Sequence, residues 1–153
     1  MTGLVLRDAK RGEVAAIVKM LADDELGRTR EEIGDPLPAP YYEAYEEIGR
    51  DPNNRLLVAE VRGEIVGTLQ LTFIRGLSRK AARRAQIEAV RVAGPHRGTG
   101  LGEQMIRAAI EIARNAGCSI VQLTTDKRRT DAHRFYERLG FVASHEGMKF
   151  SLD

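Results

Sequence analysis

Apolar and polar residues follow two different periods along this chain, and each period predicts one kind of element. Where apolar residues recur every three or four positions, we expect helices, at 12–26, 41–48, 100–116 and 130–139. Where short runs are rich in apolar residues, whether continuous or alternating with polar ones, we expect strands, at 4–6, 55–61, 65–74, 85–92 and 119–125. The pattern ends in an expected hairpin of 141–143 and 148–152. Stretches rich in glycine, proline or charge, at 27–40 and 76–84, are expected to be loops.

The order of these elements predicts the fold class. Short turns, such as the one at 62–64, join neighbouring strands and predict antiparallel pairing. The long helix between the strands at 85–92 and 119–125 predicts one parallel crossover. We find no internal repeat and no linker, so the sequence predicts a single mixed α/β domain over 1–153.

Composition and charge exclude several classes of protein. The chain has 153 residues, of which 42% are hydrophobic and 30% charged, as is typical of a soluble domain with its own core. The net charge of +2 is too small to indicate a nucleic-acid partner, and no apolar run approaches the roughly 20 residues of a membrane span. The only cysteine, Cys118, excludes an internal disulfide. Because the N-terminus also lacks a signal-peptide pattern, we expect a cytoplasmic protein.

A glycine-rich run follows the strand expected at 85–92 and precedes the longest helix. It reads Val90-Arg91-Val92-Ala93-Gly94-Pro95-His96-Arg97-Gly98-Thr99-Gly100-Leu101-Gly102-Glu103. A strand, a glycine turn and a helix start form the arrangement that cradles a phosphate through backbone N–H groups. No lysine follows the glycines, which excludes the P-loop, and the third glycine comes one residue too early for the dinucleotide fingerprint. The spacing that fits is Arg-x-x-Gly-x-Gly at Arg97, Gly100 and Gly102, and the alternative is a glycine turn that binds nothing.

A second motif lies near the C-terminus and reads Asp131-Ala132-His133-Arg134-Phe135-Tyr136-Glu137-Arg138-Leu139-Gly140-Phe141. Together, the two motifs resemble the signatures of the GNAT superfamily, the acyl-CoA-dependent N-acyltransferases. The resemblance implies the GNAT fold, a mixed, mostly antiparallel sheet that is splayed between its fourth and fifth strands and flanked by helices. It also implies that acetyl-CoA lies in the cleft between those two strands. The wider run 127–136, followed by Ser144 and His145, is similar to aminoalkylphosphonate N-acetyltransferases.

The resemblance also implies which residues hold acetyl-CoA. The backbone of Val90 and Val92 would pair with the pantetheine arm like an added strand, and the backbone of 97–103 would bind the pyrophosphate. The full set of implied cofactor-binding residues is Val90, Arg91, Val92, Arg97, Gly98, Thr99, Gly100, Leu101, Gly102, Glu103, Arg129 and Tyr136. Arg129 stands where many members of the family carry an asparagine, so an arginine able to reach a CoA phosphate replaces the usual amide.

Two residues are candidates for proton transfer. By resemblance, Tyr136 is the general acid for the departing thiolate, because a phenol with a reference pKa of about 10 stays protonated at neutral pH. Its alternative role is an aromatic anchor for the last helix. Glu88 is the candidate general base, and strand alternation places it on the side of Gln86, Val90 and Val92. Its alternative role is a solvated carboxylate on a half-exposed sheet.

Other reactive side chains give weaker signals. The three histidines show no metal-ligand spacing, so we expect no metal site. Cys118 has no activating neighbour, so we expect a structural thiol and direct transfer without an acyl-enzyme. Five cations crowd one loop, namely Arg75, Arg79, Lys80, Arg83 and Arg84. A solvated hairpin loop is the favoured interpretation, and a collar for an anionic acceptor is the alternative.

The sequence therefore predicts an enzyme that moves an acetyl group from acetyl-CoA to a primary amine of a small molecule, such as an aminoalkylphosphonate. A protein acetyltransferase acting on an N-terminus or a lysine is the rival within the class. A non-catalytic acyl-CoA sensor is the rival outside it. No nucleic-acid or membrane partner is expected, and the habit of the family makes a homodimer one expected form.

Overall fold

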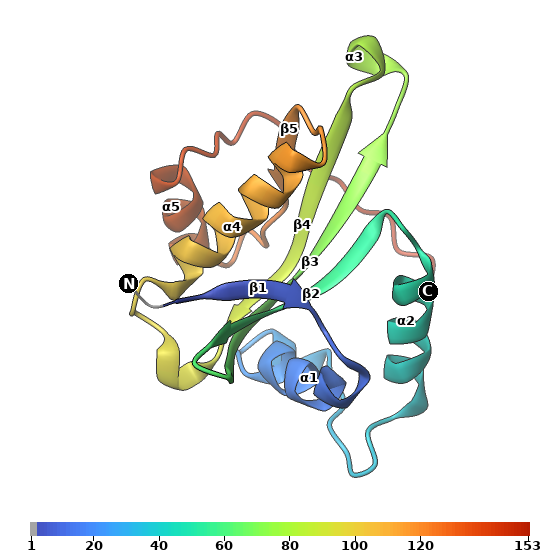
Figure 1. Cartoon of the computed structure of the whole chain (residues 1–153), viewed down its shortest axis with the longest axis vertical. Coiled ribbons are helices and arrows are strands. Elements are labelled where there is room, and N and C mark those ends of the chain that lie inside the picture. The colour runs from blue at the N-terminus through green and yellow to red at the C-terminus, as the bar shows by residue number, and fades with distance from the viewer. Residues whose placement is uncertain (1–2) are drawn as a thin grey trace. The chain divides into compact units, whose positions relative to one another are not determined.

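The computed structural model describes residues 3–153 and divides into two compact units, Met1–Gln122 and Leu123–Asp153. The first unit holds almost the whole sheet (Figure 1). Its strands are β1 (Val5–Asp8), β2 (Asn54–Val61), β3 (Glu64–Arg75), β4 (Arg83–Val92) and β5 (Ile120–Leu123), whose last residue falls in the second unit. They follow one another across the sheet in chain order, and the first four pair antiparallel.

The fifth strand reverses the pattern. The Ser119 N–H donates to the Arg83 carbonyl, and three residues further along both strands the Gln122 side chain donates to that of Gln86. The residue numbers increase in the same direction along both strands, so β4 and β5 run parallel. The helix α4 (Leu101–Asn115) makes the crossover between them. The expected mixed, mostly antiparallel sheet is confirmed.

The remaining elements are helical, and most agree with the expected positions. A 3-10 turn η1 (Arg11–Glu13) leads into α1 (Val14–Ala22), η2 (Gly27–Thr29) follows it, and α2 (Ala39–Arg50) precedes the β2–β3 hairpin. A short turn α3 (Ser78–Ala81) joins β3 to β4, and η3 (Gly94–His96) precedes α4. The second unit holds α5 (Thr130–Arg138).

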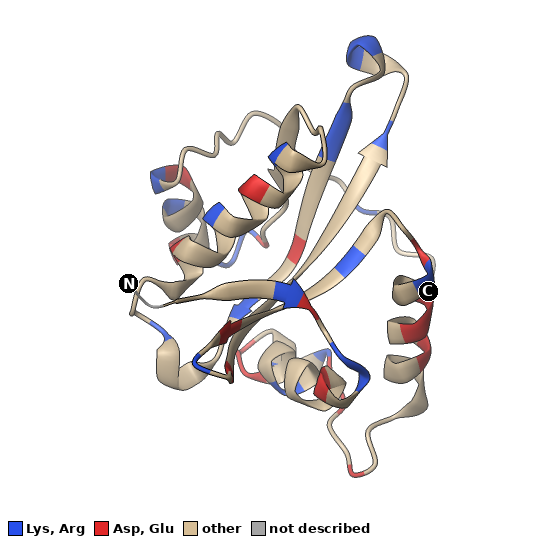
Figure 2. Cartoon of the chain, viewed as in Figure 1, with Lys and Arg blue, Asp and Glu red and all other residues tan. Residues whose placement is uncertain are grey.

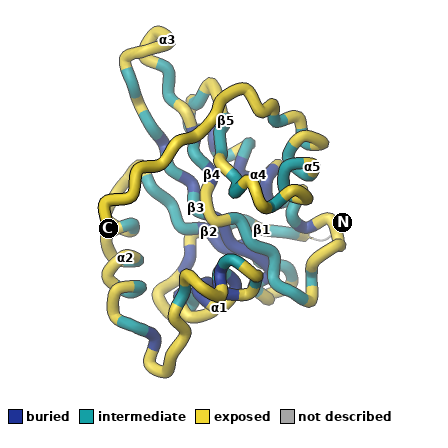
Figure 3. Tube along the Cα trace, turned by 180° about the vertical axis from the view of Figure 1, so that it is seen from behind, coloured by how far each residue is buried: buried dark blue, intermediate teal, exposed yellow. Residues whose placement is uncertain are grey.

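Different helices cover the two faces of the sheet. Val58 of β2 packs with Ile17 of α1. Gly67 of β3 faces α4, because a Cβ atom at this position would lie 2.5 Å from Met105 Sδ. Val58 pairs with Thr68, the neighbour of Gly67, and successive strand residues point to opposite faces. Hence α1 lies on one face and α4 on the other, and the residues buried between them lie at the centre of the sheet (Figure 3).

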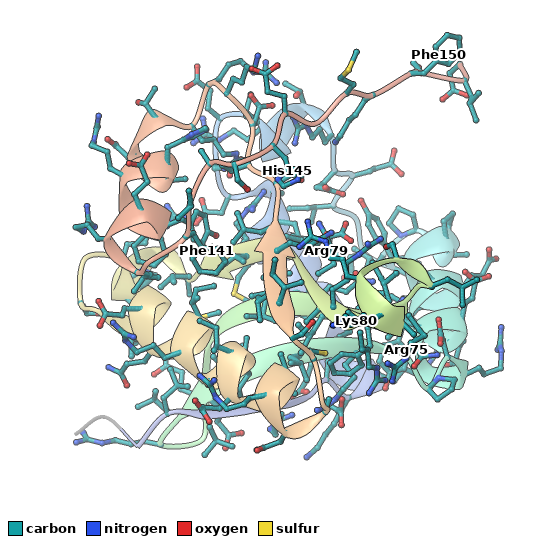
Figure 4. The ribbon with its side chains drawn as sticks, turned by 90° about the horizontal axis from the view of Figure 1, so that it is seen from above. Arg75, Arg79, Lys80, Phe141, His145 and Phe150 are labelled. Atoms are coloured by element: carbon teal, nitrogen blue, oxygen red, sulfur yellow. The ribbon has the colours of Figure 1, made fainter. Side chains whose placement is uncertain are left out.

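The expected C-terminal hairpin is wrong. Residues 141–153 contain no strand, although apolar and polar residues alternate there. The Ser144 N–H donates to the Val142 carbonyl two residues back, so the backbone turns where the first strand was expected to run straight. A lone two-stranded hairpin is marginal in water without a further strand or helix to pack on. Met148 and Phe150 are 95% and 89% exposed, and Figure 4 shows Phe150 at the far end of the segment.

Several element boundaries also differ from expectation; for example, β1 ends at Asp8 rather than at 6, and α2 begins at Ala39 rather than at 41. The first helix ends at Ala22 rather than near 26, because Asp24 accepts the Gly27 N–H and turns the chain into η2. The last parallel strand ends at Leu123 rather than at 125.

Candidate functional site

A β-bulge interrupts the second half of β4. Thr68 of β3 pairs with Arg91 and Gln70 pairs with Glu88, so two steps along β3 face three steps along β4. Within the bulge, Ala89 has a φ of 54°, in the left-handed region that residues other than glycine seldom adopt. Bulges bend a strand and change the direction of its side chains, and they are common beside active sites.

Because of the bulge, the side chains beyond it point in other directions than simple alternation predicts. Simple alternation places Val90 and Val92 on the side of Glu88. Residues that pair directly share a face, and Val92 pairs with Gly67, which faces α4, whereas Glu88 and Arg91 pair with residues on the other face. Val92 therefore points away from Glu88, and Val90 lies inside the bulge. The expectation fails because one additional residue reverses the alternation beyond it.

Glu88 lies on the face that α1 covers. It pairs with Gln70, which pairs in turn with Leu56, and Leu56 packs on the core cluster beneath α1. Its side chain is exposed and has no hydrogen-bond or ion-pair partner among residues 3–153. A carboxylate in this setting is available to accept a proton from a bound molecule.

The bulged part of β4 extends past the neighbouring strand. Gln122 of β5 lies beside Gln86, and β5 ends one residue later. The stretch 88–92 therefore continues beyond the end of β5. Backbone groups that leave a sheet in this way can pair with an extended ligand, as an added strand would.

The glycine loop after β4 has the backbone conformation that an anion site needs. Gly98 and Gly100 have φ of 76° and 84°, which only glycine adopts without strain. Gly100 is the N-cap of α4, a helix of 15 residues. The first N–H groups of such a helix have no acceptor inside it, and the helix dipole places positive charge at this end.

Two neighbouring carboxylates after α1 hold the loop and the end of β4. Arg97 of the loop donates to the Asp23 carbonyl at 2.7 Å, and its guanidinium lies 3.4 Å from the Asp23 carboxylate. Arg91 of β4 lies 3.3 Å from the Asp24 carboxylate, which also accepts the Gly27 N–H at 2.5 Å. The second pair is the more buried, with side chains 17% and 21% exposed against 48% and 53% for the first.

Asp23 and Asp24 were not among the functional residues predicted from the sequence. A signal was present, because acidic side chains at the C-terminal end of a helix face the negative end of its dipole. Two such residues in succession indicate that cations from elsewhere in the fold neutralise their negative charges. Arg97, expected as a phosphate ligand, therefore has a structural partner in Asp23.

The second unit carries the other motif. The ring of Tyr136 makes edge-on contacts with the rings of Phe135, at a centroid distance of 5.1 Å, and Phe141, at 5.6 Å. Arg129 is the N-cap of α5, and its carbonyl accepts the N–H of Ala132. These contacts join α5 to the segment after it. The roles of Tyr136 as general acid and of Arg129 as a cofactor ligand stay predictions.

Two of the five loop cations have structural roles. Arg83 lies over the Phe73 ring at 4.6 Å and donates to the Ala116 carbonyl at 2.7 Å. Arg75 donates to the Ala81 carbonyl at 2.8 Å across the base of the tip. The collar suggested by the sequence therefore reduces to the remaining three cations.

The other reactive groups stay apart from one another. His96 Nε2 lies 3.2 Å from a Glu64 carboxylate oxygen, and His145 Nδ1 lies 2.7 Å from Ser144 Oγ. Within the described part of the chain, no three metal-binding side chains come together. Nor does any helix there combine the length and apolar character needed to cross a bilayer.

Comparison with known proteins identifies the family. Residues 15–141 match the model of the acetyltransferase (GNAT) family. An aminoalkylphosphonate N-acetyltransferase of Salmonella typhimurium is 39% identical over 95 residues, 62% of this chain and 61% of that one. A glucosamine 6-phosphate N-acetyltransferase of Trypanosoma brucei brucei is 36% identical over 90 residues, 59% of each chain. The chain thus spans about three fifths of the length of these curated relatives.

A solved structure shows a likeness over nearly the full length. It is described as a transcriptional regulator from Bacillus halodurans C-125, is 50% identical, and has a TM-score of 0.93 over 97% of this chain and 99% of that one. The family match includes β4, the glycine loop and α5, well over half of the chain. The protein therefore belongs to the GNAT acetyltransferase family.

Proposed function

We propose that the protein transfers an acetyl group from acetyl-CoA directly to a primary amine of a small molecule that also carries a phosphorus oxyanion. The bulge in β4 is the observation that carries the proposal. The exposed Glu88 side chain, which has no hydrogen-bond or ion-pair partner among residues 3–153, lies at the start of the backbone that extends past β5, and the glycine loop follows that stretch. A proton acceptor, a backbone edge and an anion site thus lie in succession along 88–102.

The residues present fit acetyl-CoA. The left-handed Gly98 and Gly100 open the start of α4 to a pyrophosphate, and the edge of β4 at 88–92 is long enough for the pantetheine arm. Bound there, acetyl-CoA supplies the acyl group as a thioester. The side chains of Arg91 and Arg97, held by Asp24 and Asp23, keep the strand end and the loop in place.

Two residues of the chain move the protons. Glu88 takes a proton from the ammonium group of the acceptor, and the freed nitrogen attacks the thioester carbonyl carbon. As the C–N bond forms and the C–S bond breaks, the Tyr136 phenol gives a proton to the thiolate, and the second proton that the nitrogen must lose restores the Tyr136 phenol. The products are the N-acetylated amine and free CoA.

The relatives and one strand position support an anionic acceptor. The compounds in the names of both curated relatives carry an amine and a phosphorus oxyanion. Arg84 is exposed and lies four residues before Glu88 in β4, so both point to the same face about 13 Å apart. An arginine side chain spans about half of that distance, so an acceptor molecule that binds Arg84 by its anion can reach Glu88 with its amine. We therefore assign the anion to Arg84 rather than to the cations at the tip.

One assay tests the activity and the acceptor. Release of free CoA from acetyl-CoA is measured against aminoalkylphosphonates, amino-sugar phosphates, the matching neutral amines, polyamines and peptides, and cofactor binding is measured separately by calorimetry. We expect an anionic amine to be the best acceptor. Arg84→Gln should raise KM for it at least tenfold and leave KM for the neutral amine unchanged. A peptide as the best acceptor would instead establish the protein acetyltransferase.

Catalytic variants separate an enzyme from a sensor. Glu88→Gln and Tyr136→Phe should each lower kcat by about 10²-fold, the usual scale for a lost general base or acid, while CoA still binds. Tight CoA binding with no turnover on any acceptor would support the acyl-CoA sensor. An unchanged rate in either variant would remove that residue from the mechanism.

A further inference from the structure

An uncharged polar side chain, Gln86, lies on β4 between Arg84 and Glu88. It is two residues from each of them, so all three side chains point to the same face, and Gln86 is about 6.5 Å from either neighbour along the strand. Figure 2 shows this part of β4 as blue, then tan, then red. An acceptor that binds Arg84 by its anion and Glu88 by its amine therefore lies over Gln86.

The neighbouring strands extend this position into a polar row across the sheet. Gln86 pairs with Thr72 of β3, and Thr72 pairs with Asn54 of β2. On the other side, Gln122 of β5 donates from Nε2 to Gln86 Oε1 at 2.7 Å. All four side chains are partly exposed, whereas Ala85, which points to the opposite face, is fully buried. The polar row is therefore open to a bound molecule.

The hydrogen bonds within the polar row leave some donors and acceptors unused. Asn54 Oδ1 accepts from Thr72 Oγ1 at 3.2 Å and from Gln70 Nε2 at 3.0 Å, so the hydroxyl hydrogen of Thr72 is engaged. Gln86 uses only its oxygen, and its Nε2 donates to no acceptor among residues 3–153. The Gln122 oxygen accepts no hydrogen bond from the same residues. The centre of the row thus offers both donors and an acceptor to a ligand.

These unused groups match a hydroxyl group. A hydroxyl both donates and accepts, so it can accept from Gln86 Nε2 and donate to Gln122 Oε1. A methylene group does neither, and over the same amides it displaces water without replacing the hydrogen bonds that the water made. Sites that hydrogen-bond a hydroxyl of the substrate discriminate against the analogue that lacks it.

We propose that Gln86 is a specificity-determining residue, and that the acceptor carries a hydroxyl group on the carbon chain between its amine and its phosphorus oxyanion. The inference rests on the proposed function, because Arg84 and Glu88 fix the two ends of the acceptor. It narrows the acceptor to hydroxylated amines and excludes a plain alkyl chain as the preferred spacer. Gln122 is a positioning residue, since its N–H holds the oxygen of the Gln86 amide and leaves Nε2 for the ligand.

The test compares two acceptors that differ by one hydroxyl group. The pair is 3-amino-2-hydroxypropylphosphonate and 3-aminopropylphosphonate, which share the amine, the anion and the chain length. Release of free CoA from acetyl-CoA gives kcat/KM for each. We expect the wild-type chain to favour the hydroxylated acceptor by at least about tenfold. Gln86→Leu keeps the bulk of the side chain and removes its amide, so it should bring the ratio of the two kcat/KM values to about one.

Thr72→Val is the matched control. It removes a hydroxyl from the same row but leaves the Gln86 amide and its bond to Gln122 in place, because the Thr72 hydrogen goes to Asn54. The wild-type ratio should therefore persist. The ratio compares two acceptors on one protein, so a loss of folded protein lowers both values equally and cannot imitate the effect of Gln86→Leu.

Three results would overturn the assignment to Gln86. They are equal kcat/KM for the two acceptors in the wild-type chain, a ratio that Gln86→Leu leaves unchanged, and a fall in the ratio that is as large in Thr72→Val. Failure of the proposed function gives a different result. Turnover of no anionic amine, with CoA still bound, would refute that function and this inference with it.

Discussion

We expect the ion pair between Arg91 and Asp24 to contribute more to the stability of the fold than the ion pair between Arg97 and Asp23. The change is Asp24→Asn, which keeps the shape of the side chain and its acceptor for the Gly27 N–H but removes the charge 3.3 Å from Arg91. Exposed pairs contribute about 0.2–1 kcal/mol, and breaking a fully buried pair costs about 3–5 kcal/mol. With side chains 17% and 21% exposed, this pair lies between these limits, and we expect a loss of about 2 kcal/mol.

The matched control is Asp23→Asn, one residue away. Its pair with Arg97 is about half exposed, with side chains 48% and 53% accessible, so the expected loss is about 0.5 kcal/mol. For a chain of this size, the two losses correspond to a fall in Tm of about 4–8 °C for Asp24→Asn and about 1–2 °C for Asp23→Asn. Thermal unfolding in 50 and 500 mM salt measures both.

The dependence on salt should also distinguish the two ion pairs. Screening acts on exposed charges, so the effect of Asp23→Asn should vanish in 500 mM salt and most of the effect of Asp24→Asn should persist. Equal shifts in Tm for the two variants, or a loss for Asp24→Asn that disappears in salt, would refute the argument from burial.

Three further predictions concern other parts of the fold. Gly67→Ala should destabilise by about 1–3 kcal/mol in urea unfolding, because the new Cβ would lie 2.5 Å from Met105 Sδ and 2.9 Å from the Arg91 carbonyl oxygen; a neutral effect would mean that β3 and the bulge are less close. Gly100→Ala and Gly117→Ala each force a left-handed residue and should cost about 1 kcal/mol, yet only Gly100→Ala should weaken CoA binding by calorimetry. Hydrogen bonds from Arg7 lower the pKa of Glu13 from 4.5 to about 2, so this carboxylate stabilises the fold above pH 4.5 and the stabilisation is lost as the pH falls towards 2. Glu13→Gln should remove about 1 kcal/mol at pH 7 and much less at pH 2, and a loss that is independent of pH would contradict the assignment.

Local patterns predicted most of the elements because they depend on neighbours in the sequence. The helix that became α4 has a single apolar side and begins after a run of glycines, and both features are visible in the residues. The turn at Arg62 and Gly63 is equally local, with both residues left-handed, as a two-residue hairpin requires.

The features that the sequence did not predict depend on residues that are distant along the chain. Nothing in the stretch around Ala89 marks an additional residue, because a bulge exists only relative to the strand beside it. Arg91 and Asp24 are 67 positions apart, so no window along the chain shows that they meet. The alternation at 148–152 is a true strand pattern, but a strand also needs a neighbour to pair with, and the sequence does not say whether one is there.

The double role of Asp24 sets a boundary for building chimeras. The segment between α1 and α2 is a surface connection, and such segments are the ones most easily exchanged between relatives. Asp24 holds the first turn of that segment through Gly27 and the end of β4 through Arg91. A graft that starts before Asp24 therefore replaces part of the support of the end of β4 together with the segment itself. A graft that starts after Gly27 exchanges the loop alone.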